Sequence, residues 1–144
     1  MKRFKNWVQP VFDEDGWAYA NWIMRNDRRP YGWRCLNHEN LKIGKNTDIG
    51  HGCFLQAKYG IELGENVELG PFVYICSWST IDDKKGKVII KDGAKIGAHS
   101  TVMPNVTIGK DVTVGAHSFV SKDLPDKVVA VGVPCKIKYT KLEV

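Results

Sequence analysis

Residues 90–121 read IKDGAKIGAHSTVMPNVTIGKDVTVGAHSFVS, and an aliphatic residue returns at every sixth position of this stretch. A spacing of six matches neither the 3.6-residue period of an α-helix nor the alternation of a simple strand. It is typical of short strands that are joined by tight turns. Three such strands would complete one triangular coil of eighteen residues, so the stretch predicts a parallel β-solenoid.

The same period begins earlier in the chain, and its further aliphatic anchors are Ile43, Ile49, Leu55, Leu63, Leu69, Ile75 and Ile81. Two extra residues interrupt it between positions 55 and 63, and three between positions 81 and 90. We expect the anchors to point into the prism and to stack ~4.8 Å apart. The glycine that follows many of them suits a corner where a Cβ would clash or where φ must be positive. Counted in threes, the anchors predict four full coils and part of a fifth.

The segments on either side of the repeat lack the period. Residues 1–40 hold four of the five tryptophans, and we expect them to cap the first coil, with acceptor binding as an alternative role. Residues 17–25 within this cap predict a short helix with three apolar side chains on one face. Residues 41–125 are predicted to form the solenoid. Residues 126–144 are predicted to add a strand over 128–131, a turn and a basic tail, all within one structural domain.

The composition excludes several classes of protein. With 43% hydrophobic and 26% charged residues, the 144-residue chain reads as an ordinary globular protein. Its net charge of +5 arises from basic residues dispersed among Asp and Glu, which argues against nucleic acid as a partner. No signal peptide and no run of ~20 apolar residues is visible, so we expect a cytoplasmic protein without membrane insertion. The four cysteines are scattered without a Cys-x-x-Cys pair and are expected to be buried.

The repeats and the tail Gly132-Val133-Pro134-Cys135-Lys136-Ile137 together resemble the hexapeptide acyltransferases. Within that superfamily the chain is similar to the galactoside and maltose O-acetyltransferases and to small enzymes that acetylate sugars for surface polysaccharides. The resemblance covers roughly residues 41–139 and is most specific from residue 96 onward. It implies a left-handed parallel β-helix and a homotrimer with active sites in the clefts between chains. It further implies transfer of an acetyl group from acetyl-CoA to a hydroxyl of a sugar or nucleotide sugar.

The resemblance also places the coenzyme contacts, at Ala98, Ala116, Ser121, Lys122 and Lys136. Ala98 and Ala116 are eighteen residues apart, so they are expected to stack one coil above the other. Small side chains there would let the pantetheine arm lie close to the backbone. The two lysines suit the nucleotide phosphates as mobile point charges.

The general base is not settled by the resemblance. Galactoside-type enzymes carry a base histidine at the position of Thr80, and residues 76–83 of this chain contain no histidine. Imidazole titrates near neutrality and suits the role, so the candidates are His99 first, then His51, then His117. Asp82 would orient a histidine or bind the acceptor. Alternatively, an amino sugar would enter as the free amine and need no enzymic base.

Three other functions fit the sequence less well. A γ-class carbonic anhydrase uses the same solenoid with a His-x4-His pair, but Pro104 stands five residues after His99, and no metal is expected. A non-catalytic scaffold would not need small residues followed by Ser121-Lys122. Nucleotide-sugar synthesis would need a glycine-rich nucleotide loop before the repeats, and none is visible.

Overall fold

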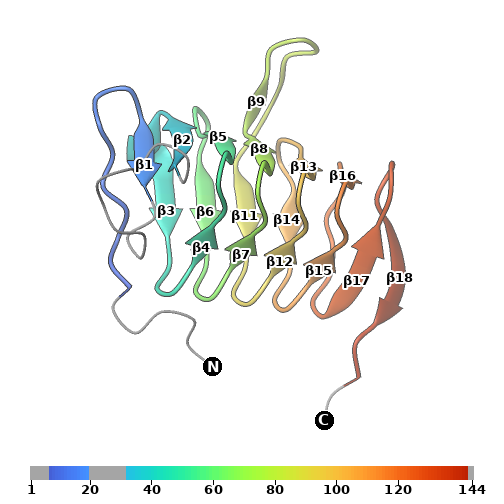
Figure 1. Ribbon diagram of the computed structural model, residues 1–144. Coiled ribbons are helices and arrows are strands. Elements are labelled where there is room, and N and C mark those ends of the chain that lie inside the picture. The colour runs from blue at the N-terminus through green and yellow to red at the C-terminus, as the bar shows by residue number, and fades with distance from the viewer. Residues whose placement is uncertain (1–6, 20–31, 143–144) are drawn as a thin grey trace.

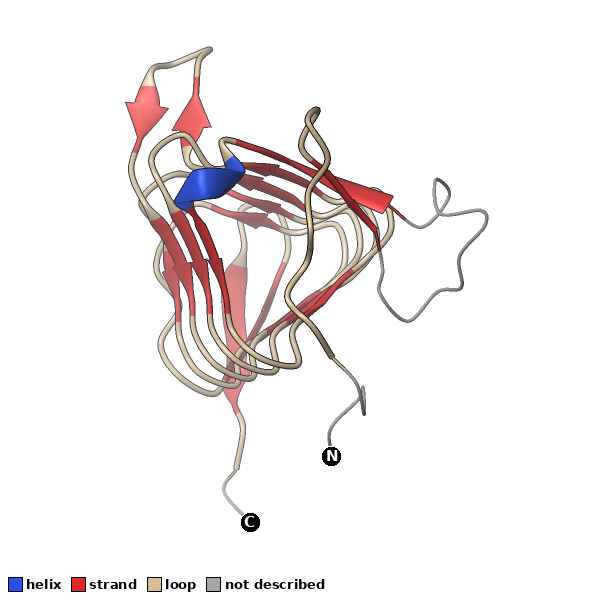
Figure 2. Ribbon diagram, turned by 90° about the vertical axis from the view of Figure 1, so that its left-hand side faces the viewer, coloured by secondary structure: helices blue, strands red, loops and turns tan. Residues whose placement is uncertain are grey.

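The computed structural model describes residues 7–19 and 32–142. Three of the sheets in these residues make the sides of a triangular prism, with the coils stacked along its axis (Figures 1 and 2). Sheet one contains β1 (Trp17–Tyr19), β2 (Gly32–Leu36), β5 (Phe54–Gln56), β8 (Tyr74–Cys76), β13 (Thr101–Val102) and β16 (Phe119–Val120). Sheet two contains β3 (Leu41–Ile43), β6 (Ile61–Leu63), β11 (Val88–Ile90) and β14 (Thr107–Ile108). Sheet three contains β4 (Asp48–Ile49), β7 (Glu68–Leu69), β12 (Lys95–Ile96), β15 (Thr113–Val114), β17 (Val128–Val131) and β18 (Lys136–Thr140).

The chain visits sheets two, three and one in turn and then begins the next coil. Neighbouring coils pair in parallel, as where Ile96 on β12 lies opposite Val114 on β15. The result is a left-handed parallel β-helix, an exception to the right-handed preference of parallel crossovers. The fold class predicted from the repeat and the resemblance is confirmed.

The repeat sets the core because the anchors, with the exception of Ile81, point inward. Leu55, Ile75 and Ile90 have no exposed surface, and burial of each such side chain contributes about 1.5–3 kcal/mol. A second inward residue follows most anchors four places later, and these are buried as well, among them Val67, Val73, Val106 and Val112. Two inward residues in most units therefore fill the prism.

Ile81 departs from the predicted pattern. It was expected to be an anchor, but 98% of its surface is exposed, so this prediction is wrong. The chain between β8 and β11 leaves the prism and forms a projecting antiparallel hairpin of β9 (Trp78–Ser79) and β10 (Lys84–Lys85), visible above the coils in Figure 1. Ile81 lies in the turn between these two strands, while Val88 and Ile90 provide the inward residues of the coil.

The glycines after the anchors are explained by close approach between coils. A Cβ on Gly70 would stand 2.8 Å from the backbone nitrogen of Ala98, and one on Gly97 would stand 2.5 Å from that of Ala116. Positive φ occurs two positions later in the same turns, for example at Asn66 and His99. Of the two reasons expected for these glycines, steric clash is therefore the one that applies.

The two ends of the prism are closed differently. At the N-terminal end, residues 7–16 cross the first coil (Figure 2), and the Trp7 indole donates a hydrogen bond to the Thr47 carbonyl at 2.7 Å. Trp17–Tyr19 is a strand antiparallel to β2, so the predicted helix is wrong there, and its remainder lies outside the described residues. At the other end β18 folds back antiparallel on β17, which confirms the strand and turn predicted there. No helix in the described ranges is long and apolar enough to cross a bilayer.

Candidate active site

Three of the histidines gather at one edge of the prism, where sheet three turns into sheet one. We call this edge the histidine corner; it comprises residues 50–53, 70–73, 97–100 and 115–118. Each turn donates one backbone hydrogen bond to the turn of the preceding coil. The bonds run from His117 N to Ala98 O at 2.9 Å, from His99 N to Pro71 O at 3.0 Å, and from Phe72 N to His51 O at 2.9 Å.

These bonds align the side chains of the histidine corner in two parallel columns. The first column contains His51, Pro71, Ala98 and Ala116, and the second contains Gly52, Phe72, His99 and His117. The stacking predicted for Ala98 with Ala116 is therefore present, and His99 and His117 stack in the same way. His51, the second candidate for the base, lies in the alanine column instead.

The second column is a continuous stack of rings. The imidazoles of His99 and His117 have centroids 5.0 Å apart and planes 8° from parallel. Phe72 stacks on the other face of His99 at 5.1 Å, and His51 meets the Phe72 ring nearly edge-on at 5.3 Å. His99, the first candidate for the base, is thus held between two rings while its edge remains exposed.

Buried hydroxyl groups fix the inner side of the same corner. The Ser118 hydroxyl donates to the Gly115 carbonyl at 2.6 Å, and the Ser100 hydroxyl donates to the same oxygen at 3.1 Å. Each hydroxyl also accepts a backbone N–H, Ser100 from Ser118 and Ser118 from Gly132. Because these polar groups are satisfied inside the prism, the corner presents its outer side chains from a rigid backbone.

The remaining predicted residues separate into two groups. Lys136 begins β18 opposite Val131, whose side chain lies over Gly115, so Lys136 extends the histidine corner at its C-terminal end. Ser121 and Lys122 instead lie beyond β16, at the edge between sheets one and two. We call that edge the hairpin corner; it comprises residues 57–60, 77–87, 103–106 and 121–123.

Asp82 lies in the turn of the hairpin and is engaged locally. A hydrogen bond with Ser79 lowers the pKa of its carboxyl group, and Lys84 lies 3.6 Å away. Thr80, the position at which the resemblance implies a base histidine, is exposed in the same turn. Within one protomer the structure therefore does not bring Asp82 to His99, because sheet one separates their corners.

The outer face of sheet one is the apolar side of the prism. Its central outward row is Arg34, Phe54, Tyr74, Thr101 and Phe119, in register across five strands. Phe54 and Tyr74 are in ring contact at 5.7 Å, and burial beside Cys76 raises the pKa of Tyr74 to about 12. The corresponding outward row of sheet three is polar over its first four strands: Asp48, Glu68, Lys95 and Thr113.

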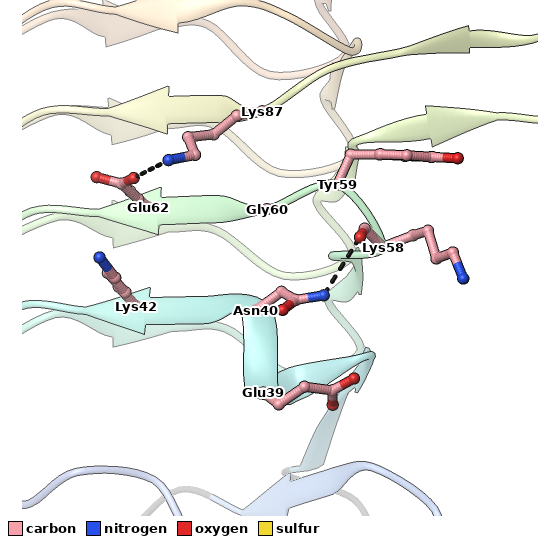
Figure 3. Close-up of a pocket in the computed structure, with 8 residues that line it drawn as sticks. All are labelled: Glu39, Asn40, Lys42, Lys58, Tyr59, Gly60, Glu62 and Lys87. Atoms are coloured by element: carbon pink, nitrogen blue, oxygen red, sulfur yellow. Dashed lines mark hydrogen bonds and ion pairs between the residues drawn. The ribbon is translucent and has the colours of Figure 1, made fainter.

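A cavity of about 340 Å³ opens on the outer face of sheet two, next to the hairpin corner (Figure 3). It is lined by Glu39, Asn40, Lys42, Lys58, Tyr59, Gly60, Glu62 and Lys87. Lys87 crosses over Gly60 to reach Glu62 at 2.7 Å, and this hydrogen-bonded ion pair lowers the pKa of Glu62. None of the predicted site residues lines this cavity, and its mixed charges suit a polar ligand.

No group of three His, Cys, Asp or Glu side chains in residues 7–19 and 32–142 is arranged to hold a metal ion. Cys35, Cys53 and Cys76 are buried thiols, as expected, and Cys135 is half-buried beside β16. Phe72 is the site residue that the sequence reasoning missed. Aligning the turns would have found it, because His99 and His117 occupy the same place in other coils.

Two family models match the repeat. "Bacterial transferase hexapeptide (six repeats)" matches residues 87–122, and "Hexapeptide repeat of succinyl-transferase" matches residues 40–75. A curated relative, the galactoside O-acetyltransferase of Lactococcus lactis subsp. lactis (strain IL1403), is 38% identical over 140 residues. That match covers 91% of this chain and 58% of the relative, so the chain spans little more than half the relative's length.

Solved structures show the same architecture. A maltose O-acetyltransferase from Clostridium difficile 630 superposes with a TM-score of 0.73 and 34% identity, covering 77% of this chain and 64% of that one. A galactoside acetyltransferase in complex with coenzyme A superposes with a TM-score of 0.68 and 27% identity, covering 75% of this chain and 58% of that one. The solenoid with its stacked corners is thus shared with proteins that are named as acetyltransferases.

Proposed function

This chain belongs to the hexapeptide-repeat acetyltransferase superfamily, and from that premise we propose that it transfers an acetyl group from acetyl-CoA to a hydroxyl of a sugar or nucleotide sugar. The observation that carries the proposal is the histidine corner. There, two stacked alanines lie directly beside two stacked imidazoles, so a narrow ledge for a thiol cofactor adjoins a candidate base.

The coenzyme would lie along the histidine corner, parallel to the prism axis. In this arrangement the pantetheine arm passes Ala116 and then Ala98, and the thioester reaches His99. The nucleotide end would point toward Lys136, whose ammonium suits its phosphates. Structures of relatives with coenzyme A support a coenzyme site in this fold.

Ser121 and Lys122 support an assembly of several chains. They are five and six residues beyond Ala116, across the width of sheet one, or roughly 16–20 Å at about 3.3 Å per residue. If a second protomer covered the apolar outer face of sheet one, the hairpin corner of that protomer would approach the histidine corner of the first. One coenzyme would then contact both groups, and we therefore propose the homotrimer with its sites between chains.

His99 would act as the general base. Its imidazole would accept the proton of the acceptor hydroxyl as that oxygen attacks the thioester carbonyl, so that the C–O bond forms and the C–S bond breaks. The proton would then pass to the departing thiolate. The absence of a histidine at Thr80 favours a second candidate: N-acetylation of an amino sugar, whose free amine would need no enzymic base.

The acceptor class follows from relatives that are named for galactosides and maltose. We propose a sugar of a surface polysaccharide or its activated precursor as the acceptor. Because the donor would be acetyl-CoA, we place the reaction in the cytoplasm.

Calorimetry with coenzyme A and acetyl-CoA tests the donor, and release of free thiol in the presence of candidate sugars tests the acceptor. Coenzyme binding with thiol release that depends on a sugar hydroxyl would support O-acetylation. Release with amino sugars alone would support the second candidate. A failure to bind coenzyme at millimolar concentration would reject both and leave a scaffold role. Light scattering of the same sample would show whether the chain is a trimer.

A further inference from the structure

Phe72 adopts a backbone conformation that its residue type disfavours. Its φ is 59°, in the left-handed region. Apart from glycines, the described residues with positive φ are Asn, Asp or His in all but two cases, namely Phe72 and Lys127. Asn, Asp and His tolerate this region, whereas a bulky aromatic residue is a true outlier there. Strained residues of this kind cluster at functional sites.

The neighbouring coil is built to receive the Phe72 ring. Gly52 occupies the same column one coil earlier, and a Cβ at that position would stand 2.5 Å from Cδ1 of the ring. The ring therefore fills the space that a side chain at position 52 would take. From there it faces His51 at 5.3 Å on one side and His99 at 5.1 Å on the other, while 48% of its surface remains exposed.

Phe72 marks the end of the small-residue ledge, which Ala116 and Ala98 form. Going toward the N-terminus, the first column changes from Ala116 and Ala98 to Pro71 and then His51. The Phe72 ring lies beside that change, adjacent to the imidazole that the proposed function assigns as the base. A group that follows the ledge past His99 would meet Pro71, His51 and the Phe72 ring.

We propose that the Phe72 ring closes the N-terminal end of the coenzyme ledge and restricts the acyl donor to acetyl-CoA and comparably short thioesters. This inference rests on the proposed function, because it requires the coenzyme to lie along the histidine corner with its thioester near His99. A methyl group beyond the carbonyl fits before the ring. Each further methylene of a longer acyl chain must displace the ring or leave the ledge.

The test is calorimetry of coenzyme A, acetyl-CoA and butyryl-CoA with the intact protein, which needs no knowledge of the acceptor. The informative variant is Phe72→Asn, because asparagine tolerates the left-handed backbone and removes the ring. Phe72→Tyr keeps the ring. Lys127→Asn is the matched control, since it makes the same kind of backbone-compatible exchange at the edge between sheets two and three, away from the histidine corner.

The wild type and the Lys127→Asn and Phe72→Tyr variants should bind butyryl-CoA at least about tenfold more weakly than acetyl-CoA, the lower end of discrimination per methylene in apolar pockets. In Phe72→Asn the ratio of the butyryl-CoA to the acetyl-CoA dissociation constant should fall to about threefold or less, with the affinity for coenzyme A itself unchanged. Equal ratios in wild type and Phe72→Asn, with coenzyme A bound by both, would overturn the inference alone. No binding of any of the three by the wild type would remove the proposed function, and the inference with it.

Discussion

Gly52 and Phe72 are matched across two neighbouring coils: the absence of a side chain at one makes room for the ring of the other. Gly52 has a φ of +75°, and its missing Cβ would fall against Cδ1 of Phe72. The pair sets where the ring stack of the histidine corner ends. It also fixes the Phe72 ring between His51 and His99 without any hydrogen bond to the ring.

The variant Gly52→Ala should lower the free energy of unfolding by about 1–3 kcal/mol, because alanine is strained at positive φ and its methyl group meets the Phe72 ring. Denaturant unfolding followed by circular dichroism measures the change. In a Phe72→Asn background the clash is absent, so the same substitution should cost only the backbone penalty of about 1 kcal/mol. Identical costs in the two backgrounds would show that the two positions are not coupled.

The variant His99→Ala should lower turnover by roughly 10²–10⁴ while leaving coenzyme A affinity unchanged, which is the scale of a lost general base. Steady-state thiol release and calorimetry on the same preparation separate the two effects. His38→Ala is the control, since His38 stacks on Phe12 in the N-terminal cap, 4.5 Å between centroids. Unchanged turnover in His99→Ala would transfer the role to His51 or to the amine of the acceptor.

The variant Ala116→Leu should weaken coenzyme A binding by about tenfold or more, or ~1.4 kcal/mol, because the larger side chain occupies the ledge. Ala116 is exposed, so the fold should tolerate the change. Thr113→Leu provides the comparison, as Thr113 lies half-buried on the outer face of sheet three. Equal coenzyme affinity in both variants would exclude the ledge as the coenzyme site.

The buried thiols should give the protein a pH-dependent stability in alkali. Burial raises the pKa of Cys53 to about 12, and burial together with the charge of Glu39 raises that of Cys35 to about 12. A raised pKa means that folding favours the neutral thiol. Its stabilisation is complete below the ordinary value of 9.0 and is lost as the pH rises from there toward 12.

Iodoacetamide labelling, read by mass spectrometry, tests the burial of the thiols at a pH below the alkaline loss of stability. At pH 8.5 in native buffer, the half-buried Cys135 should react first, and Cys35 and Cys53 should be protected. In denaturant all of them should react at similar rates. Cys53→Ala should lessen the loss of stability above pH 9, and an unaltered alkaline profile in that variant would contradict the assignment.

The period of six was sufficient to predict the prism, because every coil must place its anchors inside to bury them. Leu55, Leu69 and Val114 lie in the core as their spacing required. The same reasoning failed at Ile81, since a spacing of six also arises by chance in a segment that leaves the prism. Nothing in the period distinguishes an inserted hairpin from another unit when both offer an aliphatic residue in register.

The candidate site was predictable only in part. Counting residues was enough to pair Ala98 with Ala116, because one coil separates them. A count in steps of eighteen does not reach His51, because the interruption after Leu55 shifts the register between coils; only aligning the turns on Ile49 and Ile96 places His51 with Ala98. Nor could it place the Phe72 ring, whose position depends on the glycine one coil away.

The backbone hydrogen bonds of the histidine corner fix the spacing of equivalent side chains along the prism axis at one coil. The distance of an equivalent side chain from Phe72 along this edge is therefore a whole number of coils, each about 4.8 Å high. Duplicating residues 97–114 would insert one coil between Ala98 and Ala116 and would move Lys136 farther from Phe72 by the height of that coil. In this architecture the number of coils sets the distance between the two ends of a site that runs along the edge. That distance can be changed by adding a coil, with every original side chain of the site kept.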